Sequence, residues 1–142
     1  MDRFEERRRA EAPIETCWDV LTAAEHAPAW VPFVSAASAH GEPGVGRLLV
    51  VTGSVLGFTM DVEQTVDLWE PPHAYGWRAE QPFPTRLRVE LAALTPATTH
   101  VVASIEAALE RFPVGRRVAK VTVRRQFAKS ADNLVALVAA AS

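Results

Sequence analysis

Apolar and polar residues alternate along much of the chain with the period of two that is typical of β-strands. The clearest case is residues 58–69, where alternate positions share one face: Phe58, Met60, Val62, Gln64, Val66 and Leu68. The same pattern predicts strands over residues 75–79, 86–93 and 100–109. Further strands are predicted over residues 2–11, 33–40 and 47–52, with turns at 41–44, 53–57 and 95–98.

Two segments instead have apolar residues three or four positions apart, which predicts amphipathic helices. The first starts at Pro13 and presents Ile14, Cys17, Trp18, Leu21 and Ala24 on one face, with a short helical turn to follow at residues 25–30. The second is opened by Phe112-Pro113 and runs to Ala141. Its apolar stripe consists of Ala119, Val123, Phe127, Ala131, Leu134 and Val138. At about 1.5 Å per residue, a helix of roughly 25 residues would be near 40 Å long.

This order of elements predicts an α+β fold in a single domain over residues 1–142. Strands joined by tight turns form an antiparallel meander, and six or seven twisted strands curl into a half-barrel. A long helix lying in the concave side cannot fill a strongly curved sheet along its whole length. We therefore expect an internal cavity lined by the inward rows, and such cavities are the usual sites for small ligands.

Composition narrows the classes of partner. The 142 residues carry a net charge of −2, and 49% of them are hydrophobic, as in ordinary globular proteins. A slightly acidic chain favours neither nucleic acid nor an anionic membrane. No apolar run approaches the roughly 20 residues of a membrane span, and the charged N-terminus is unlike a signal peptide. A single cysteine fits a reducing cytosol, so we expect a cytoplasmic protein.

Short motifs in this order resemble the START-like (SRPBCC, helix-grip) superfamily of polyketide cyclases and related lipid-binding proteins. The segment from Ala12 to Thr22 resembles its A-P-x-x-x-V-W-x-x-L opening. Similar elements follow in the family's order: Pro28-Ala29-Trp30-Val31-Pro32, Gly44-Val45-Gly46, Glu70-Pro71-Pro72 and Thr99-His100-Val101. The resemblance implies the helix-grip fold. It leaves function open, because one fold hosts many activities. No P-loop or dinucleotide fingerprint appears in the sequence, and we expect no cofactor.

Two positions depart from the family pattern, since Cys17 replaces a valine and Thr98 replaces a glycine. Aromatase/cyclase relatives are thought to orient a polyketide chain with a cavity arginine and histidine. Here the inward row of the last strand is apolar, with Val101, Ala103, Ile105 and Ala107 and no histidine. This difference weighs against enzymatic cyclisation.

Eight residues are the candidate ligand contacts: Trp30, Phe33, Phe58, Met60, Gln64, Tyr75, Trp77 and Phe127. The aromatic rings and Met60 would line a pocket for a ring system or acyl chain, although each of them also suits plain core packing. Gln64 is polar within an apolar row. Facing inward, it would hydrogen-bond a ligand carbonyl or hydroxyl, whereas a bulge would turn it outward. Tyr75 offers a hydroxyl on the same kind of surface.

Charged clusters have structural explanations as well. Glu6 and Arg8 lie in phase with Phe4 and Ala10, either as a buried pair at one end of the cavity or, as we favour, as solvated charges. Basic residues recur along the early part of the last predicted helix: Arg111, Arg116, Arg117, Lys120, Arg124, Arg125 and Lys129. This run would bind an anionic ligand, an acyl carrier partner or nucleic acid, but the solvated face of an amphipathic helix is the interpretation that we favour.

No metal or nucleophile motif is present. The histidines at 26, 40, 73 and 100 lack the spacing of a metal site, and Cys17 lies on a helix face that we expect to be buried.

We therefore predict a binding protein for a lipid, polyketide or aromatic metabolite. The alternatives are a cyclase or aromatase acting in the same cavity and an interaction module that uses the basic helix. The sequence leaves a homodimer open.

Overall fold

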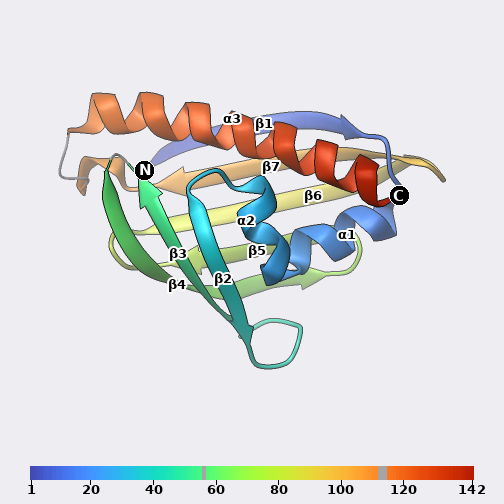
Figure 1. Cartoon of the computed structure of the whole chain (residues 1–142), viewed down its shortest axis with the longest axis horizontal. Helices are drawn as coiled ribbons and strands as arrows, with labels where there is room; N and C mark the ends of the chain where they lie inside the picture. Colours follow the sequence, from blue (N-terminus) through green and yellow to red (C-terminus); the bar gives the residue numbers. More distant parts are fainter. Residues whose placement is uncertain (56, 112–114) are drawn as a thin grey trace.

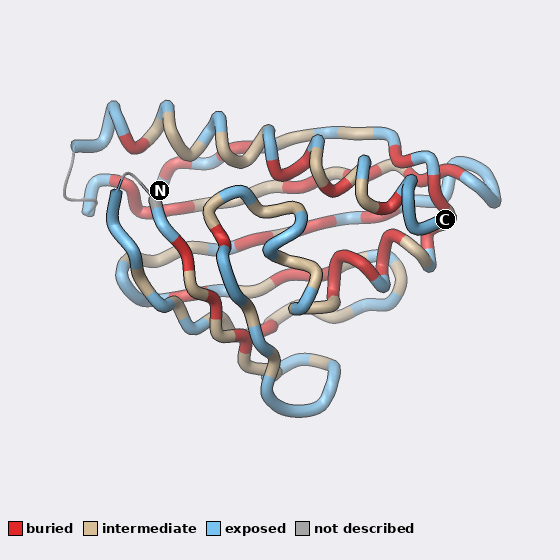
Figure 2. The backbone as a smooth tube through the Cα atoms, in the orientation of Figure 1, coloured by how far each residue is buried: buried red, intermediate tan, exposed pale blue. Residues whose placement is uncertain are grey.

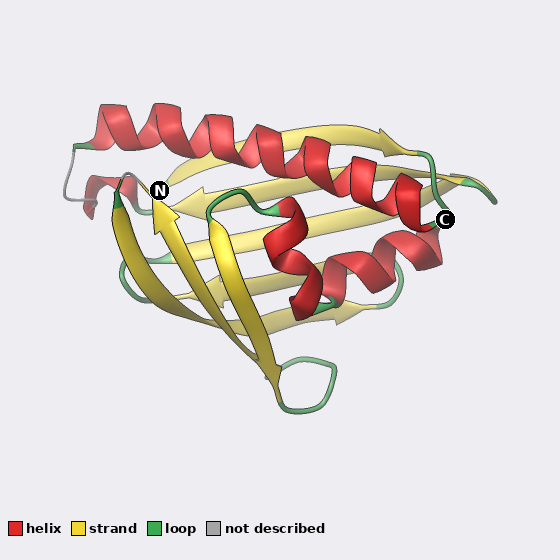
Figure 3. Ribbon diagram, in the orientation of Figure 1, coloured by secondary structure: helices red, strands yellow, loops and turns green. Residues whose placement is uncertain are grey.

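The computed structural model describes residues 1–55, 57–111 and 115–142, and it confirms the predicted helix-grip fold (Figures 1 and 3). The strands are β1 (Asp2–Ala10), β2 (Val34–His40), β3 (Leu48–Val55), β4 (Phe58–Glu70), β5 (Ala74–Ala79), β6 (Thr85–Thr95) and β7 (Thr98–Ala107). The α-helices are α1 (Ile14–Thr22), α2 (Ala27–Trp30) and α3 (Arg116–Ala141). Two short 3₁₀ helices, η1 (Ala24–His26) and η2 (Leu109–Arg111), complete the order.

All seven strands form one antiparallel sheet in the order β1-β7-β6-β5-β4-β3-β2. Strands β2 to β7 pair with their neighbours in sequence, so short turns suffice to connect them. Only β1 is brought from the far end of the chain, to pair with β7. The sheet curves strongly, and β2 and β3 cross the direction of β6 and β7 when viewed from the helix side (Figure 1).

Helix α3 runs along the concave side of the sheet for 26 residues. Its buried positions include four of the six predicted stripe residues, namely Ala119, Ala131, Leu134 and Val138. Figure 2 shows buried segments along the side of α3 that faces the sheet and exposed ones on the outer side. The predicted opening of this helix at Phe112-Pro113 lies outside the described residues.

Two predictions for the β3–β4 hairpin and for β4 are wrong. The turn predicted over residues 53–57 is narrower, because β3 continues to Val55 and Gly53 pairs with Met60. Leu68 does not continue the inward row of β4. A register shift between Val66 and Leu68 moves the alternation by one position, so Trp69 packs against the core instead.

Polar contacts tie α3 to the first strand. Arg116 Nε and Nη2 donate to the two carboxylate oxygens of Asp2, at 3.1 and 2.9 Å. Further along, Arg8 Nε donates to Asp132 Oδ1 at 2.9 Å. These bonds join segments more than 110 residues apart in sequence, and they fix the position of the helix over the sheet edge.

Candidate ligand-binding cavity

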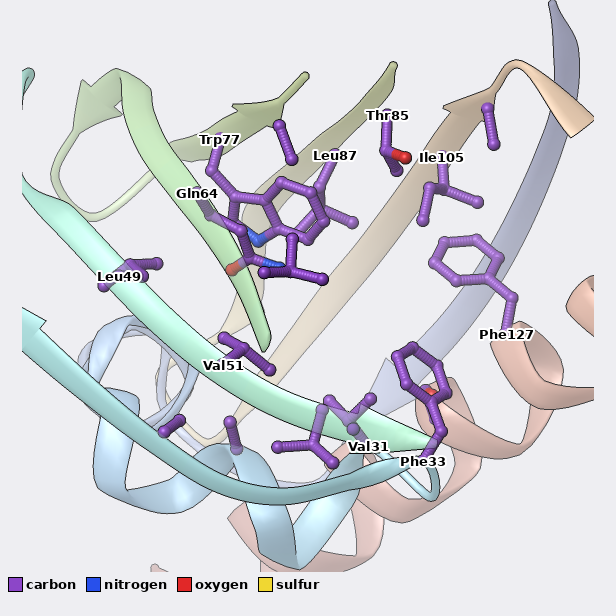
Figure 4. Close-up of a pocket in the computed structure, with 18 of the residues that line it drawn as sticks. Val31, Phe33, Leu49, Val51, Gln64, Trp77, Thr85, Leu87, Ile105 and Phe127 are labelled. Carbon is purple, nitrogen blue, oxygen red and sulfur yellow. The ribbon is translucent and has the colours of Figure 1, made fainter. Parts of the chain in front are cut away.

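A cavity of about 210 Å³ lies between the concave face of the sheet, the α1–α2 segment and α3 (Figure 4). Its wall is built from the inward rows of β2 to β7, from α1, η1 and α2, and from one face of α3. Engineered apolar cavities of roughly 150 Å³ already bind benzene, so this space accommodates a small organic molecule. Gln81 and Pro82, which are exposed, also line it and mark where it approaches solvent.

Seven of the eight predicted ligand contacts line this cavity: Trp30, Phe33, Met60, Gln64, Tyr75, Trp77 and Phe127. They come from α2, the segment before β2, β4, β5 and α3, so the fold gathers residues nearly 100 positions apart. Phe58 does not line it, contrary to the prediction. It begins β4 at the hairpin, and 41% of its surface is exposed.

The sequence interpretation missed several wall residues. Val51 and Leu87 lie in predicted strands and line the cavity, and Figure 4 shows Leu87 beside Trp77. Alternation gave the inward direction of Leu87, whereas the continuous apolar run over residues 47–52 gave no direction for Val51. Phe83 lies between Pro82 and Pro84 in the connection before β6, where no periodicity exists to assign a direction.

The polar groups of the wall are few, and three hydroxyls among them bind the backbone. Thr22 Oγ1 donates to the Trp18 carbonyl and Ser130 Oγ to the Gln126 carbonyl, both at 2.8 Å. Thr85 Oγ1 donates to the Phe83 carbonyl at 3.2 Å. Among the described residues that line the cavity, none is Asp, Glu, Lys, Arg or His. The wall is therefore almost entirely apolar and carries no formal charge near neutral pH.

Gln64 is different from these hydroxyl groups. It pairs with Leu49 across β3 and β4, and its side chain enters the cavity beside Trp77 (Figure 4). The structure shows no protein hydrogen bond to its amide within the described part of the chain. The Gln64 side chain therefore faces inward, as we favoured from the sequence. The alternative, a bulge that turns it outward, does not occur at this position.

Tyr75 forms the end of the cavity near α1. Its ring packs edge-on with Trp18 and Trp69, at centroid distances of 6.2 and 5.9 Å. Burial among these rings raises the pKa of the Tyr75 hydroxyl to about 12, an effect that the positive charge of Arg47 partly opposes. The phenol therefore stays protonated near neutral pH, so Tyr75 cannot serve as a general base there.

A second, smaller cavity of about 20 Å³ lies behind the first, under α3. Trp30, Leu87, Phe127 and Ser130 line both cavities and separate them. Glu6 and Arg8 line only the small one, where they form an ion pair at 2.9 Å with side chains about one quarter exposed. The favoured interpretation of solvated charges is thus wrong: the pair is half-buried, because α3 covers this part of β1.

The basic run on α3 is largely outward or paired locally. Arg116 and Lys120 face the buried Asp2 carboxylate, and the Arg124 guanidinium lies 5.6 Å from the centre of the Phe4 ring. None of the run lines the large cavity. Cys17 is buried, and desolvation raises the pKa of its thiol, which makes it a poor nucleophile.

No group of three metal-binding side chains occurs within the described ranges. Across the same ranges, no helix combines the length and apolarity needed to cross a membrane.

The sequence matches the family described as polyketide cyclase / dehydrase and lipid transport over residues 1–139. This match covers almost the whole chain, and both the sheet topology and the cavity fit it. The chain belongs to this family. Its START-like fold, expected from the sequence motifs, is thereby confirmed.

Solved structures agree on the fold. A START superfamily protein from Mycobacterium smegmatis superposes with a TM-score of 0.81 at 17% identity, with 99% of each chain covered. The Zhui aromatase/cyclase from a Streptomyces strain, R1128, also gives 0.81, at 15% identity, covering 96% of this chain and 93% of its own. TTHA0849 from Thermus thermophilus gives 0.83 at 13% identity, with 99% of each covered. No curated protein matches the sequence.

Proposed function

We propose that this protein binds a hydrophobic small molecule, such as a lipid, polyketide or aromatic metabolite, in the large cavity. The observation that supports this most is an apolar space of about 210 Å³ lined by the sheet and by α1, α2 and α3. Removing the apolar surface of a ligand from water supplies the affinity. The single buried cysteine is compatible with this binding taking place in the cytoplasm.

A cyclase or aromatase acting in the same cavity is the second candidate, because the family includes cyclases and one similar structure is an aromatase/cyclase. Such chemistry needs a group that moves protons near neutral pH. The described wall offers only Tyr75 as a titratable group, and its pKa is about 12. The hydroxyls of Thr22, Thr85 and Ser130 bind the backbone rather than one another. These observations favour binding over catalysis.

Native mass spectrometry of the purified protein tests the proposal. We expect a mass above that of the apoprotein, which corresponds to one co-purified apolar ligand and disappears on denaturation. Trp77→Ala should reduce the bound fraction, because Trp77 is part of the wall. Trp69→Phe is the matched control, since Trp69 packs against the core and does not line the cavity.

Two outcomes would count against binding. A protein that remains free of any added mass and does not bind neutral aromatic compounds added in excess would contradict the proposal. Turnover of a polyketide-type substrate that Tyr75→Phe abolishes would instead favour the second candidate.

A further inference from the structure

The residues of the cavity wall indicate which class of ligand the cavity binds. The inference drawn from them rests on the proposed function. We propose that the cavity selects an uncharged, planar ring system bearing a carbonyl oxygen, and that the Gln64 amide donates a hydrogen bond to that oxygen. Gln64 would then be the residue that distinguishes a ketone from a hydrocarbon of the same shape.

The prediction that the ligand is uncharged rests on the composition of the wall. No described wall residue is acidic, basic or histidine, and the only titratable one, Tyr75, remains neutral. A carboxylate or phosphate in this space would lose its hydration without gaining a counter-charge from the wall itself. The charged groups near the cavity lie outside its wall. Arg47 acts on the Tyr75 hydroxyl, and the Glu6–Arg8 pair lies on the small cavity, where Arg8 is also paired with Asp132.

The prediction that the ligand is planar rests on the aromatic residues that line the cavity. Six of them line it: Trp30, Phe33, Tyr75, Trp77, Phe83 and Phe127. Figure 4 shows Trp77 on one side of the space and Phe33 and Phe127 on another. Aromatic rings pack against one another in offset or edge-on geometry, which suits a flat polycyclic ligand.

The prediction that the ligand carries a carbonyl oxygen rests on Gln64. Its amide is both a donor and an acceptor, it lies in the cavity, and no described protein group binds it. Pairing with Leu49 holds it on β4, between β3 and β5. A ligand that leaves this amide without a partner binds less well than one that supplies an acceptor. Gln81 and Gln126 also line the cavity, and they serve below as controls.

Three compounds with one ring skeleton separate these requirements: fluorene, 9-fluorenone and fluorene-9-carboxylate. Their dissociation constants are measured by quenching of tryptophan fluorescence. The wild type should bind fluorenone about tenfold more tightly than fluorene. It should bind the carboxylate at least about tenfold less tightly than fluorenone, because the charge is desolvated.

Gln64→Leu keeps similar bulk and removes the amide. In this variant fluorenone and fluorene should bind equally, and fluorene should bind no more weakly than to the wild type. Gln81→Leu and Gln126→Leu make the same chemical change elsewhere on the wall, and both should keep the tenfold preference. If Gln64→Leu fails to fold, side-chain amide NMR of the wild type replaces it. The Gln64 NH₂ signals should then move with fluorenone and stay in place with fluorene.

The inference is overturned if the preference for fluorenone persists in Gln64→Leu, if it disappears in Gln126→Leu, or if the carboxylate binds as tightly as the ketone. Equal binding of fluorene and fluorenone to the wild type also overturns it, while leaving the proposed function intact. Failure of the wild type to bind any of the three compounds overturns both.

Discussion

The ring of Tyr75 packs edge-on against the indole of Trp69, with centroids 5.9 Å apart and planes inclined at 75°. The hydroxyl of Tyr75 is thereby held in surroundings that disfavour its ionised form. Tyr75 is the only tyrosine in the chain, so its titration is observed without interference from other phenols.

We predict that phenolate absorbance of the folded protein titrates near pH 12 and not near 10. The unfolded chain loses this proton first, so the free energy of unfolding should fall as pH rises from 10 to 12, by roughly 2 kcal/mol. Urea denaturation at several pH values measures this, with Tyr75→Phe lacking that part of the slope. A folded-state midpoint near 10 would contradict the buried position.

The Asp2–Arg116 contact predicts an effect at acid pH. The hydrogen bonds from Arg116 hold the pKa of the Asp2 carboxyl below its usual value near 3.8. The resulting stabilisation is present above that value and is lost as pH falls through the lower pKa of the folded state. Asp2→Asn should flatten the fall in stability below pH 4, as measured by urea denaturation. Asp19→Asn, at an exposed position, should leave the profile unchanged.

A glycine on β5 permits a close approach of β6. A Cβ at Gly76 would lie 2.6 Å from the Leu87 carbonyl oxygen and 2.5 Å from Arg88 Nη1. We expect Gly76→Ala to lower the free energy of unfolding by roughly 1–3 kcal/mol, because backbone must shift to admit the methyl group. Thermal denaturation should show this, and Ser104→Ala on β7, which adds no atoms, should change the stability by less than about 0.5 kcal/mol. An unchanged melting temperature in Gly76→Ala would refute the close approach.

One buried hydroxyl joins β7 to the segment between β1 and α1. Thr99 Oγ1 donates to the Ala12 carbonyl oxygen at 2.8 Å, and both residues are almost fully buried. Thr99→Val preserves shape but leaves that carbonyl without this donor, which should cost roughly 1–3 kcal/mol in urea denaturation. Thr99→Ser keeps the hydroxyl and should lose less. Equal losses in the two variants would assign the effect to packing.

Much of the fold follows from periodicity in the sequence. The alternation over residues 58–69 places Met60, Val62 and Gln64 on the inner face, and the structure confirms that all three line the cavity. The four-residue spacing in the last helix likewise identifies its inner face, including Phe127. Position in the sequence is sufficient here, because strands and helices repeat with fixed periods.

What the sequence could not show depends on irregular backbone. The bulge between Val66 and Leu68 reverses the faces, so Trp69 joins the core against the predicted pattern. Phe83 enters the cavity from a loop, and Phe58 lies too near the hairpin to reach it. The Glu6–Arg8 pair became half-buried through α3, more than 100 residues away. Burial by a helix that lies so far away in the sequence leaves no local pattern in either segment.

Binding of an uncharged aromatic reporter tests the central claim most directly. Titrated with 1-aminoanthracene, the wild type should show a saturable increase in fluorescence at one molecule per chain. Val51→Trp, which fills part of the cavity, should weaken this binding at least about tenfold, whereas Val50→Trp on the opposite face of β3 should not. Equal binding by the wild type and by folded Val51→Trp would contradict a ligand site in this cavity.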